Sequence, residues 1–384
     1  MHILRTCMAG CLAISVGGFW AVAHAAPFTL SQTYNEPTPT GQDQFGVSVS
    51  VSGNNVLIGA RGGTGQAHLF DTTTGALLQT FNDPTPTGGD RFGGSVSVSG
   101  NNVLIGADED DTNGLKVGQA HLYNATTGAL LHTFNDPTPT IGDNFGASVS
   151  VSGNNVLIGA DGDDTNGTNE GQVHLFNATT GALLQTFNDP TPTGSDHFGV
   201  SVSVSGNNVL IGADGDDTNG GDVGQAHLFN ATTGALLHTF NDPNPTNFDQ
   251  FGRSVYVSGN NVLIGAFGDD TNGVDVGQVY LFDAITGALL QTFNDPTPTD
   301  RDNFGISVSV SGNNVLIGAS GDDTNGASVG QAHLFDAITG ALLQTFNDPT
   351  ITTSDAFGRS VSLDGNNVLI AAPSYLASAG RLAH

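Results

Sequence analysis

The sequence predicts an all-β fold, a ring of seven four-stranded blades that is closed by a strand from the N-terminus. A Phe-Gly pair opens the same block seven times, first at Phe45 and last at Phe357. The first interval, from Phe45 to Phe92, is 47 residues long, and the later pairs follow every 53 residues. A fixed period of this size is typical of repeat architectures, and four short strands per repeat are typical of a β-propeller.

The repeat that starts at Phe145 illustrates each expected element in order. Residues 145–153 alternate apolar side chains with Ser, which predicts a strand, and a Gly-Asn-Asn turn follows. Residues 156–160 form a short apolar run that indicates a buried strand. A polar, acidic loop over 161–170 leads to a third strand at 171–176 and, after an Asn-Ala-Thr-Thr-Gly turn, to a fourth at 182–187. The Pro-containing segment that follows is predicted to be a connection, because Pro cannot donate to a strand ladder.

The two ends of the chain carry complementary parts of one repeat. Residues 27–40 match the end of a repeat and precede the first Phe-Gly pair. The last repeat stops after Ala379–His384, which aligns with the third strand. We therefore expect the N-terminal segment to supply the fourth strand of the last blade, which would close the ring and protect its edges.

Residues 1–25 are predicted to be a signal peptide, which leaves 26–384 as the propeller domain. Arg5 gives a basic start, an apolar stretch follows, and Ala23-His24-Ala25 resembles a cleavage site. This leader predicts a secreted, periplasmic or cell-surface protein. No other stretch reaches the roughly 18 apolar residues that a membrane-spanning helix needs.

The formal net charge is −28 at pH 7. Such a charge opposes binding to nucleic acid and to anionic lipid, whereas it favours cations or basic partners.

Acidic residues recur in the loops between the second and third strands. Because strand direction alternates, these loops share one face of the ring with the connections between blades, which each carry a further Asp. Several oxygens in one tight loop suit calcium, which takes 6–8 oxygen ligands. The alternative is a solvated turn in which Asp and Asn bond their own backbone. The candidate calcium ligands are Asp108, Asp110, Asp111, Asp161, Asp163, Asp164, Asp214, Asp216, Asp217, Asp269, Asp270, Asp322 and Asp323.

Histidines recur on the third strand of five repeats. Equivalent positions on neighbouring blades are on the order of 10–15 Å apart, because the third strand lies about two strand spacings from the innermost one. Zinc ligands sit at about 2 Å from the metal, so no shared zinc site is expected. The histidines are predicted to pack between blades; they are His68, His121, His174, His227 and His333.

The repeat resembles the FG-GAP family, which forms the propellers of integrin α-subunits and of secreted bacterial proteins. The resemblance covers 27–384 and rests on Phe-Gly, Ser-Val, the run ending in Gly-Ala, and Gly-x-x-x-Leu-Phe. It implies a seven-bladed propeller. The calcium loop of integrin-like blades, between the first two strands, does not carry over, because a short Ser-Gly-Asn-Asn turn stands there.

These features favour a non-enzymatic binding or adhesion scaffold whose partner is an extracellular protein or glycan. No nucleophile elbow, phosphate loop or zinc-protease motif is present. One alternative is a carbohydrate-binding propeller that uses Phe248 and Phe267; another is a hydrolase that uses the acidic face. The first and last blades lack the acidic loop, and the gap between them contains Arg61, Tyr375 and Arg381.

Overall fold

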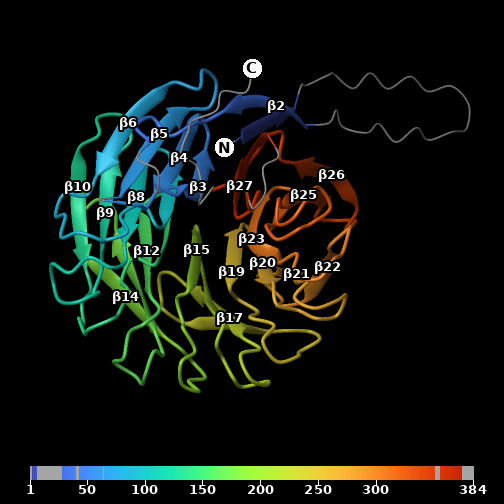
Figure 1. Cartoon of the computed structure of the whole chain (residues 1–384). Coiled ribbons are helices and arrows are strands. Elements are labelled where there is room, and N and C mark those ends of the chain that lie inside the picture. The colour runs from blue at the N-terminus through green and yellow to red at the C-terminus, as the bar shows by residue number, and fades with distance from the viewer. Residues whose placement is uncertain (1, 7–27, 40–42, 64, 351–354, 374–384) are drawn as a thin grey trace, which may run out of the picture.

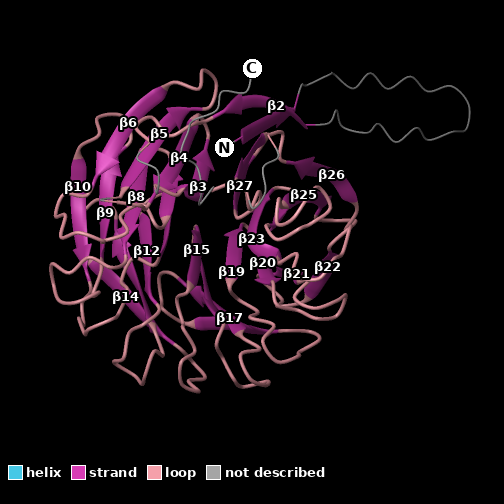
Figure 2. Ribbon diagram, in the orientation of Figure 1, coloured by secondary structure: helices cyan, strands magenta, loops and turns pink. Residues whose placement is uncertain are grey.

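The computed structural model describes residues 2–6, 28–39, 43–63, 65–350 and 355–373. These residues form strands and connections arranged as a ring (Figures 1 and 2). The expected all-β propeller with four-stranded blades is confirmed. Within the described part of the chain, no helix is long and apolar enough to cross a membrane.

Six blades are each built from four consecutive antiparallel strands. In chain order, their strands are β3 (Phe45–Ser52), β4 (Asn55–Ala60), β5 (Gln66–Asp71) and β6 (Leu77–Asn82); β7 (Val96–Ser99), β8 (Asn102–Ala107), β9 (Gln119–Asn124) and β10 (Leu130–Asn135); β11 (Ser148–Ser152), β12 (Asn155–Ala160), β13 (Gln172–Asn177) and β14 (Leu183–Asn188); β15 (Ser201–Ser205), β16 (Asn208–Ala213), β17 (Gln225–Asn230) and β18 (Leu236–Asn241); β19 (Ser254–Ser258), β20 (Asn261–Ala266), β21 (Gln278–Asp283) and β22 (Leu289–Asn294); and β23 (Phe304–Ser311), β24 (Asn314–Ala319), β25 (Gln331–Asp336) and β26 (Leu342–Asn347).

The expectation of seven blades, the last completed by the N-terminal strand, is corrected in number, because the structure has six blades of four consecutive strands and one composite sheet. That sheet has the order β2 (Phe28–Thr33), β1 (His2–Thr6), β28 (Asn367–Ala371), β27 (Ser360–Asp364). The N-terminal β2 is outermost, as expected. The third position, however, belongs to β1, whose residues fall in the predicted signal peptide, and not to Ala379–His384. The latter residues, like most of the predicted leader, lie outside the described residues.

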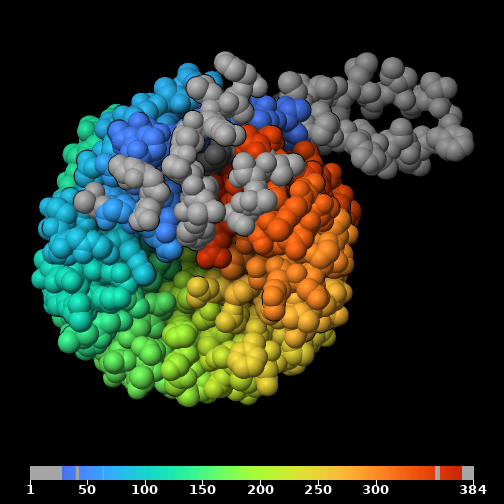
Figure 3. Space-filling model, in the orientation of Figure 1, coloured from blue at the N-terminus to red at the C-terminus, as the bar shows by residue number. Residues whose placement is uncertain are grey.

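The composite sheet is joined to the first blade by the same contacts that join other neighbours. The Ser362 hydroxyl accepts a hydrogen bond from Val51 N at 3.0 Å, and the Asn367 side-chain amide donates to Gly53 O at 3.1 Å. Tyr34 packs in one buried cluster with residues of β3, β4 and β28. Figure 3 shows the blades packed side by side in chain order round the ring.

The core lies between neighbouring sheets. The apolar second strand and the inward-facing residues of the third strand pack against the next blade, as Leu228 does against Val262 and Phe282. The innermost strands surround a central hollow of about 310 Å³ lined by Val and Ser.

Two repeated glycines explain why every block keeps its Phe-Gly pair and why the first six blocks keep their Gly-Ala run; the last has Ala371-Ala372 there. Gly252 of one Phe-Gly pair has a φ of 96°, a backbone conformation that favours glycine. A Cβ on Gly212, in the run of the preceding blade, would lie 1.9 Å from Gly252 O. The two backbones can approach only because both residues lack side chains.

Candidate functional site

Each candidate site lies where the connection between two blades meets the acidic loop of the second blade. Two carboxylates come from the connection and one from the loop between the second and third strands. In four of the five clusters three aspartates offer oxygens that lie within 4.8 Å of one another, and in the fifth a histidine takes the place of one aspartate. The clusters are Asp83, Asp90 and Asp110; Asp136, Asp143 and Asp163; Asp189, Asp196 and Asp216; Asp242, Asp249 and Asp269; and Asp295, Asp322 and His333.

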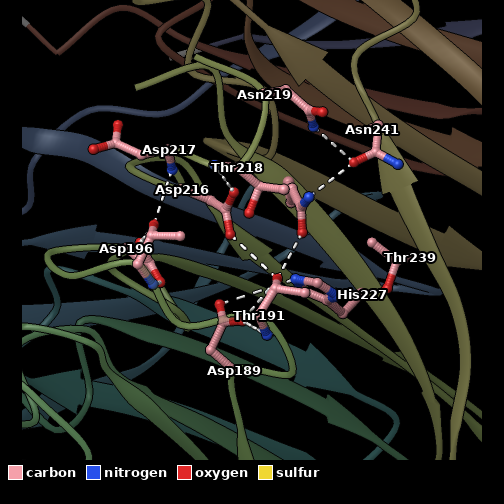
Figure 4. A network of polar contacts seen from close by, with 12 residues as sticks. Asp189, Thr191, Asp196, Asp216, Asp217, Thr218, Asn219, His227, Thr239 and Asn241 are labelled. Carbon is pink, nitrogen blue, oxygen red and sulfur yellow. Dashed lines mark hydrogen bonds and ion pairs between the residues drawn. The ribbon is translucent and has the colours of Figure 1, made fainter. Parts of the chain in front are cut away.

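The cluster between the third and fourth blades shows how the side chains are held (Figure 4). Asp189 Oδ1 accepts hydrogen bonds from the backbone N–H and the hydroxyl of Thr191, at 2.6 and 3.2 Å. The same hydroxyl lies 3.3 Å from Asp216 Oδ2. Asp196 accepts from the backbone and hydroxyl of Thr193. Each carboxylate is fixed by backbone turns, but each retains lone pairs that can face a common centre.

A buried histidine faces each of these sites where the repeat has one. His227 Nδ1 lies 3.1 Å from Thr239 Oγ1, which orients the ring. His227 Nε2 points toward Asp189 Oδ2, but the two atoms are 3.9 Å apart. Among the described residues, neither atom has a hydrogen-bond partner. The corresponding distance between His174 Nε2 and Asp136 Oδ1 is 4.0 Å.

The charges around Asp189 and His227 do not balance one another. Burial raises the pKa of Asp189 to about 6; hydrogen bonds from Thr191 oppose the rise, and the charges of Asp196 and Asp216 add to it. Burial alone lowers the pKa of His227 to about 4, so the imidazole is neutral at pH 7. A neutral imidazole cannot compensate the carboxylates, so the site favours a cation.

Two blades differ from this pattern, one at the carboxylate and one at the histidine. In the first blade the connection carries Glu36, whose longer side chain brings Oε1 to 2.9 Å from His68 Nε2. In the fifth blade Tyr280 replaces the histidine, and its hydroxyl lies 2.6 Å from Gln278 Oε1, 3.2 Å from Asp242 Oδ1 and 3.3 Å from Asp269 Oδ2. Glu36 thus lies closer to its histidine than the aspartates do, and the Tyr280 hydroxyl makes direct contact with both aspartates.

Three of the five predicted calcium loops carry three aspartates, and these have separate roles. The middle one, such as Asp216, enters the cluster and is fully buried. The next one, such as Asp217, accepts a 2.7 Å hydrogen bond from Asp222 N and shapes an exposed turn. The first one, Asp214, lies 3.1 Å from Arg253 Nη1 and 3.4 Å from His197 Nδ1, and all three residues line a second cavity. The solvated-turn interpretation therefore applies to one aspartate of the loop and the ligand interpretation to another.

The same division holds in the other blades. The aspartates that enter clusters are Asp110, Asp163, Asp216, Asp269 and Asp322. Those that cap the exposed turn are Asp111, Asp164, Asp217, Asp270 and Asp323. The first aspartate of three loops hydrogen-bonds with a side chain outside the loop: Asp108 with Arg91, Asp161 with Asn144, and Asp214 with Arg253.

The sequence analysis missed the aspartate that stands two residues before each Phe-Gly pair. Asp90, Asp143, Asp196 and Asp249 enter the clusters, yet none was among the expected ligands. Their signal is present in the sequence, because Asp-x-Phe-Gly occurs in all seven repeats. The histidines were correctly expected to be buried, and the structure adds that Nε2 faces a carboxylate.

A second cavity has a volume of about 430 Å³. Its lining includes His197, Arg253, Phe267 and Arg359, drawn from four successive sheets. Of the residues predicted for the gap between the first and last blades, Arg61 donates from Nε to Gln44 Oε1 at 2.6 Å, while Tyr375 and Arg381 lie outside the described residues.

The fold and the repeated loops define a β-propeller built from sequence repeats. The sequence matches the FG-GAP repeat over residues 85–123, 140–176, 192–229, 242–282 and 297–335, just over half of the chain. The chain therefore belongs to the FG-GAP repeat family. No curated protein matches the sequence.

Among solved structures, the computationally designed Ika8 protein is similar to this chain. The two share 18% sequence identity, with a TM-score of 0.50 over 87% of this chain and 95% of the designed one. At this identity the likeness concerns the fold alone.

Proposed function

We propose that the chain is a secreted, non-enzymatic binding scaffold whose blade junctions are held together by a hard divalent cation, calcium in the first place. The single observation that carries the proposal is the repeated gap between a buried Asp and a buried His, such as Asp189 and His227. Both atoms facing that gap lack partners among the described residues. Buried polar atoms without partners cost free energy, and repetition makes a chance arrangement an unsatisfactory explanation.

The donors around the gap suit such an ion. Asp189, Asp196 and Asp216 supply carboxylates, and Gln225 Oε1 lies 2.9 Å from the Thr191 hydroxyl at the same place. Calcium prefers 6–8 oxygens at 2.3–2.6 Å, which carboxylate, amide and hydroxyl groups provide together. A cation would also offset the repulsion among three carboxylates, which a bridging water could not do.

The ring itself supports the scaffold role. A partner would be an extracellular protein or glycan. The repetition of the carboxylate clusters at five blade junctions supports binding rather than catalysis.

A calcium titration of the chelator-treated protein tests the proposal. We expect four sites, because the Tyr280 hydroxyl already contacts Asp242 and Asp269 in the remaining cluster. Asp216→Asn should remove one site, whereas the neighbouring Asp217→Asn should remove none, since Asp217 only shapes an exposed turn. Absence of binding, or an Asp216→Asn protein with the parent's site count, would overturn the cation role and favour buried water. A parallel titration with manganese would show whether the imidazole contributes to metal binding, because manganese accepts nitrogen ligands more readily than calcium does.

A glycan-binding function is the second candidate. Phe248 is 61% exposed, and Phe267 lines the cavity of about 430 Å³. Aromatic faces beside polar groups suit sugar rings. A glycan array probed with the parent and with Phe267→Ala tests this function; equal binding by both proteins would exclude that cavity.

A further inference from the structure

The cavity of about 430 Å³ is lined mainly by residues that differ from blade to blade. All of them except Gly215 and Asp222 come from three positions of the repeat: the residue before a Phe-Gly pair, the residue after it, and the residue after a Gly-Ala run. The residue after the pair is Val, Gly, Ala, Ile or Arg in different blocks, whereas the pair itself is the same in all seven. The repeat therefore does not dictate the chemistry of this cavity.

Two arginines give the cavity a cationic side. Arg253 immediately precedes β19 and Arg359 immediately precedes β27, and Ile306 of the blade between them lines the same cavity. They are two of only eight Lys and Arg residues in a chain whose net charge is −28. Arg253 donates from Nη1 to Asp214 Oδ2 at 3.1 Å, and a guanidinium group has five N–H donors in all. Its planar fork can bind a ligand carboxylate through two parallel hydrogen bonds.

Asp214 adds a requirement for a hydrogen-bond donor in the ligand. Its side chain is buried, with the residue 4% exposed, and among the described residues its Oδ1 has no hydrogen-bond partner, although His197 Nδ1 lies 3.4 Å away. A buried carboxylate oxygen without a partner costs free energy, so a ligand hydroxyl group that donates to this atom would be favoured. Phe267 adds an aromatic surface to the cavity, and Gln250 and Asn303 add amide groups.

We propose that this cavity binds a uronic acid unit of an acidic polysaccharide. A uronate carries a carboxylate for the arginines, hydroxyl groups for Asp214 Oδ1 and the amides, and an apolar ring face for Phe267. A singly charged carboxylate suits the cavity better than a doubly charged phosphate, because Asp214 and Asp222 also line it. The volume lies within the roughly 300–1,000 Å³ that is typical of ligand pockets.

This inference rests on the glycan-binding candidate given above and is independent of the proposed cation binding. An acidic peptide is the competing ligand. It would supply carboxylates for the arginines, but it lacks the neighbouring ring hydroxyl groups that Asp214 and the amides would bind.

The test is calorimetry on the full chain with trimers of galacturonate, glucuronate and mannuronate, each compared with its methyl ester. For at least one trimer we expect the acid to bind at least about tenfold more tightly than the ester, a difference of roughly 1.4 kcal/mol. Arg359→Val introduces the residue that the first and fourth blocks have at this position, and it should remove most of that preference. The matched control is Arg91→Gln, which loses the same charge outside the cavity and introduces the residue of the first and fifth blocks; it should keep the preference.

Phe267→Ser introduces the residue of the sixth block and should weaken the binding of acid and ester alike, because both sugars lose the aromatic surface. Equal affinity of the parent for acid and ester, or an Arg359→Val protein that keeps the preference, would overturn this inference and leave the glycan-binding candidate intact. Binding of triglutamate as tightly as of the uronate trimers would also overturn it and indicate a peptide ligand. Binding of no sugar at all would overturn both the inference and the glycan-binding candidate.

Discussion

Replacement of Tyr280 by His should create a cation site where the chain has none. Tyr280 is fully buried, and its hydroxyl group occupies the centre of the Asp242, Asp249 and Asp269 cluster. Tyr280 pairs across the sheet with Thr292, as His227 pairs with Thr239. A His at this position therefore has a partner for Nδ1 and would turn Nε2 toward Asp242.

The size of the effect follows from the contacts of the hydroxyl group. One proton serves three acceptors, so the substitution removes one hydrogen bond to a charged or polar acceptor, worth about 1.5–3 kcal/mol. The metal-free Tyr280→His protein should be less stable than the parent by about that amount. Calcium at 100 times its Kd should return about 2.7 kcal/mol, because it binds only the folded state.

Urea unfolding with and without calcium, joined to a calcium titration, measures both effects. Tyr280→Phe is the matched control, because it loses the same hydroxyl group but gains no ligand; calcium should leave its deficit uncorrected. One additional site in Tyr280→His and none in Tyr280→Phe are expected. If both variants respond to calcium as the parent does, the gap between Asp and His is not where the ion binds.

Three further predictions concern the ring. Ser203→Ala should lower the free energy of unfolding by about 1–3 kcal/mol, because the buried Val257 N–H, which donates to Ser203 Oγ at 3.0 Å, would lose its acceptor. The matched control is Ser205→Ala, whose hydrogen bond is exposed; its stability should stay within about 0.5 kcal/mol of the parent's in the same urea assay. Gly212→Ala should cost about 3 kcal/mol by driving two backbones apart, and a melting temperature equal to the parent's would refute the close approach. A chain that lacks Phe28–Thr33 should melt well below the parent, because the composite sheet would lose its outermost strand, β2; equal melting would show that β2 adds nothing to the ring.

The sequence was sufficient for the blades but not for the sites between them. Alternating Val and Ser, the apolar second strand and the Phe-Gly period are local signals, and the strands follow them closely. The ligand set is not local. Asp163 turns inward because its Oδ1 accepts a hydrogen bond from Thr165 N, whereas Asp164 turns outward and accepts one from Asn169 N. Both residues are aspartates, so residue type alone could not predict which of them faces the cluster.

Residues far apart in the sequence complete each cluster. Asp136 and Asp143 belong to a connection, and they meet Asp163 only when the next blade has packed. The high density of acidic residues between the second and third strands therefore predicted the right loop but the wrong set of ligand atoms. Similarly, nothing in His2–Thr6 matches the repeat, so its place beside β28 could not be anticipated.

The composite sheet fixes the order in which this chain can finish folding. β2 is made early, yet the sheet that holds it also needs β27 and β28, which are synthesised more than 320 residues later. Blades made of consecutive strands can form as the chain emerges, whereas this sheet must wait until β27 and β28 have been synthesised. Until then β2 has exposed strand edges, which are prone to pair with other chains, and the face of the first blade that packs against the composite sheet is exposed apolar surface. Ring closure is thus the step at which this protein is most vulnerable to aggregation, and a chaperone that covers the N-terminal strand would protect it there.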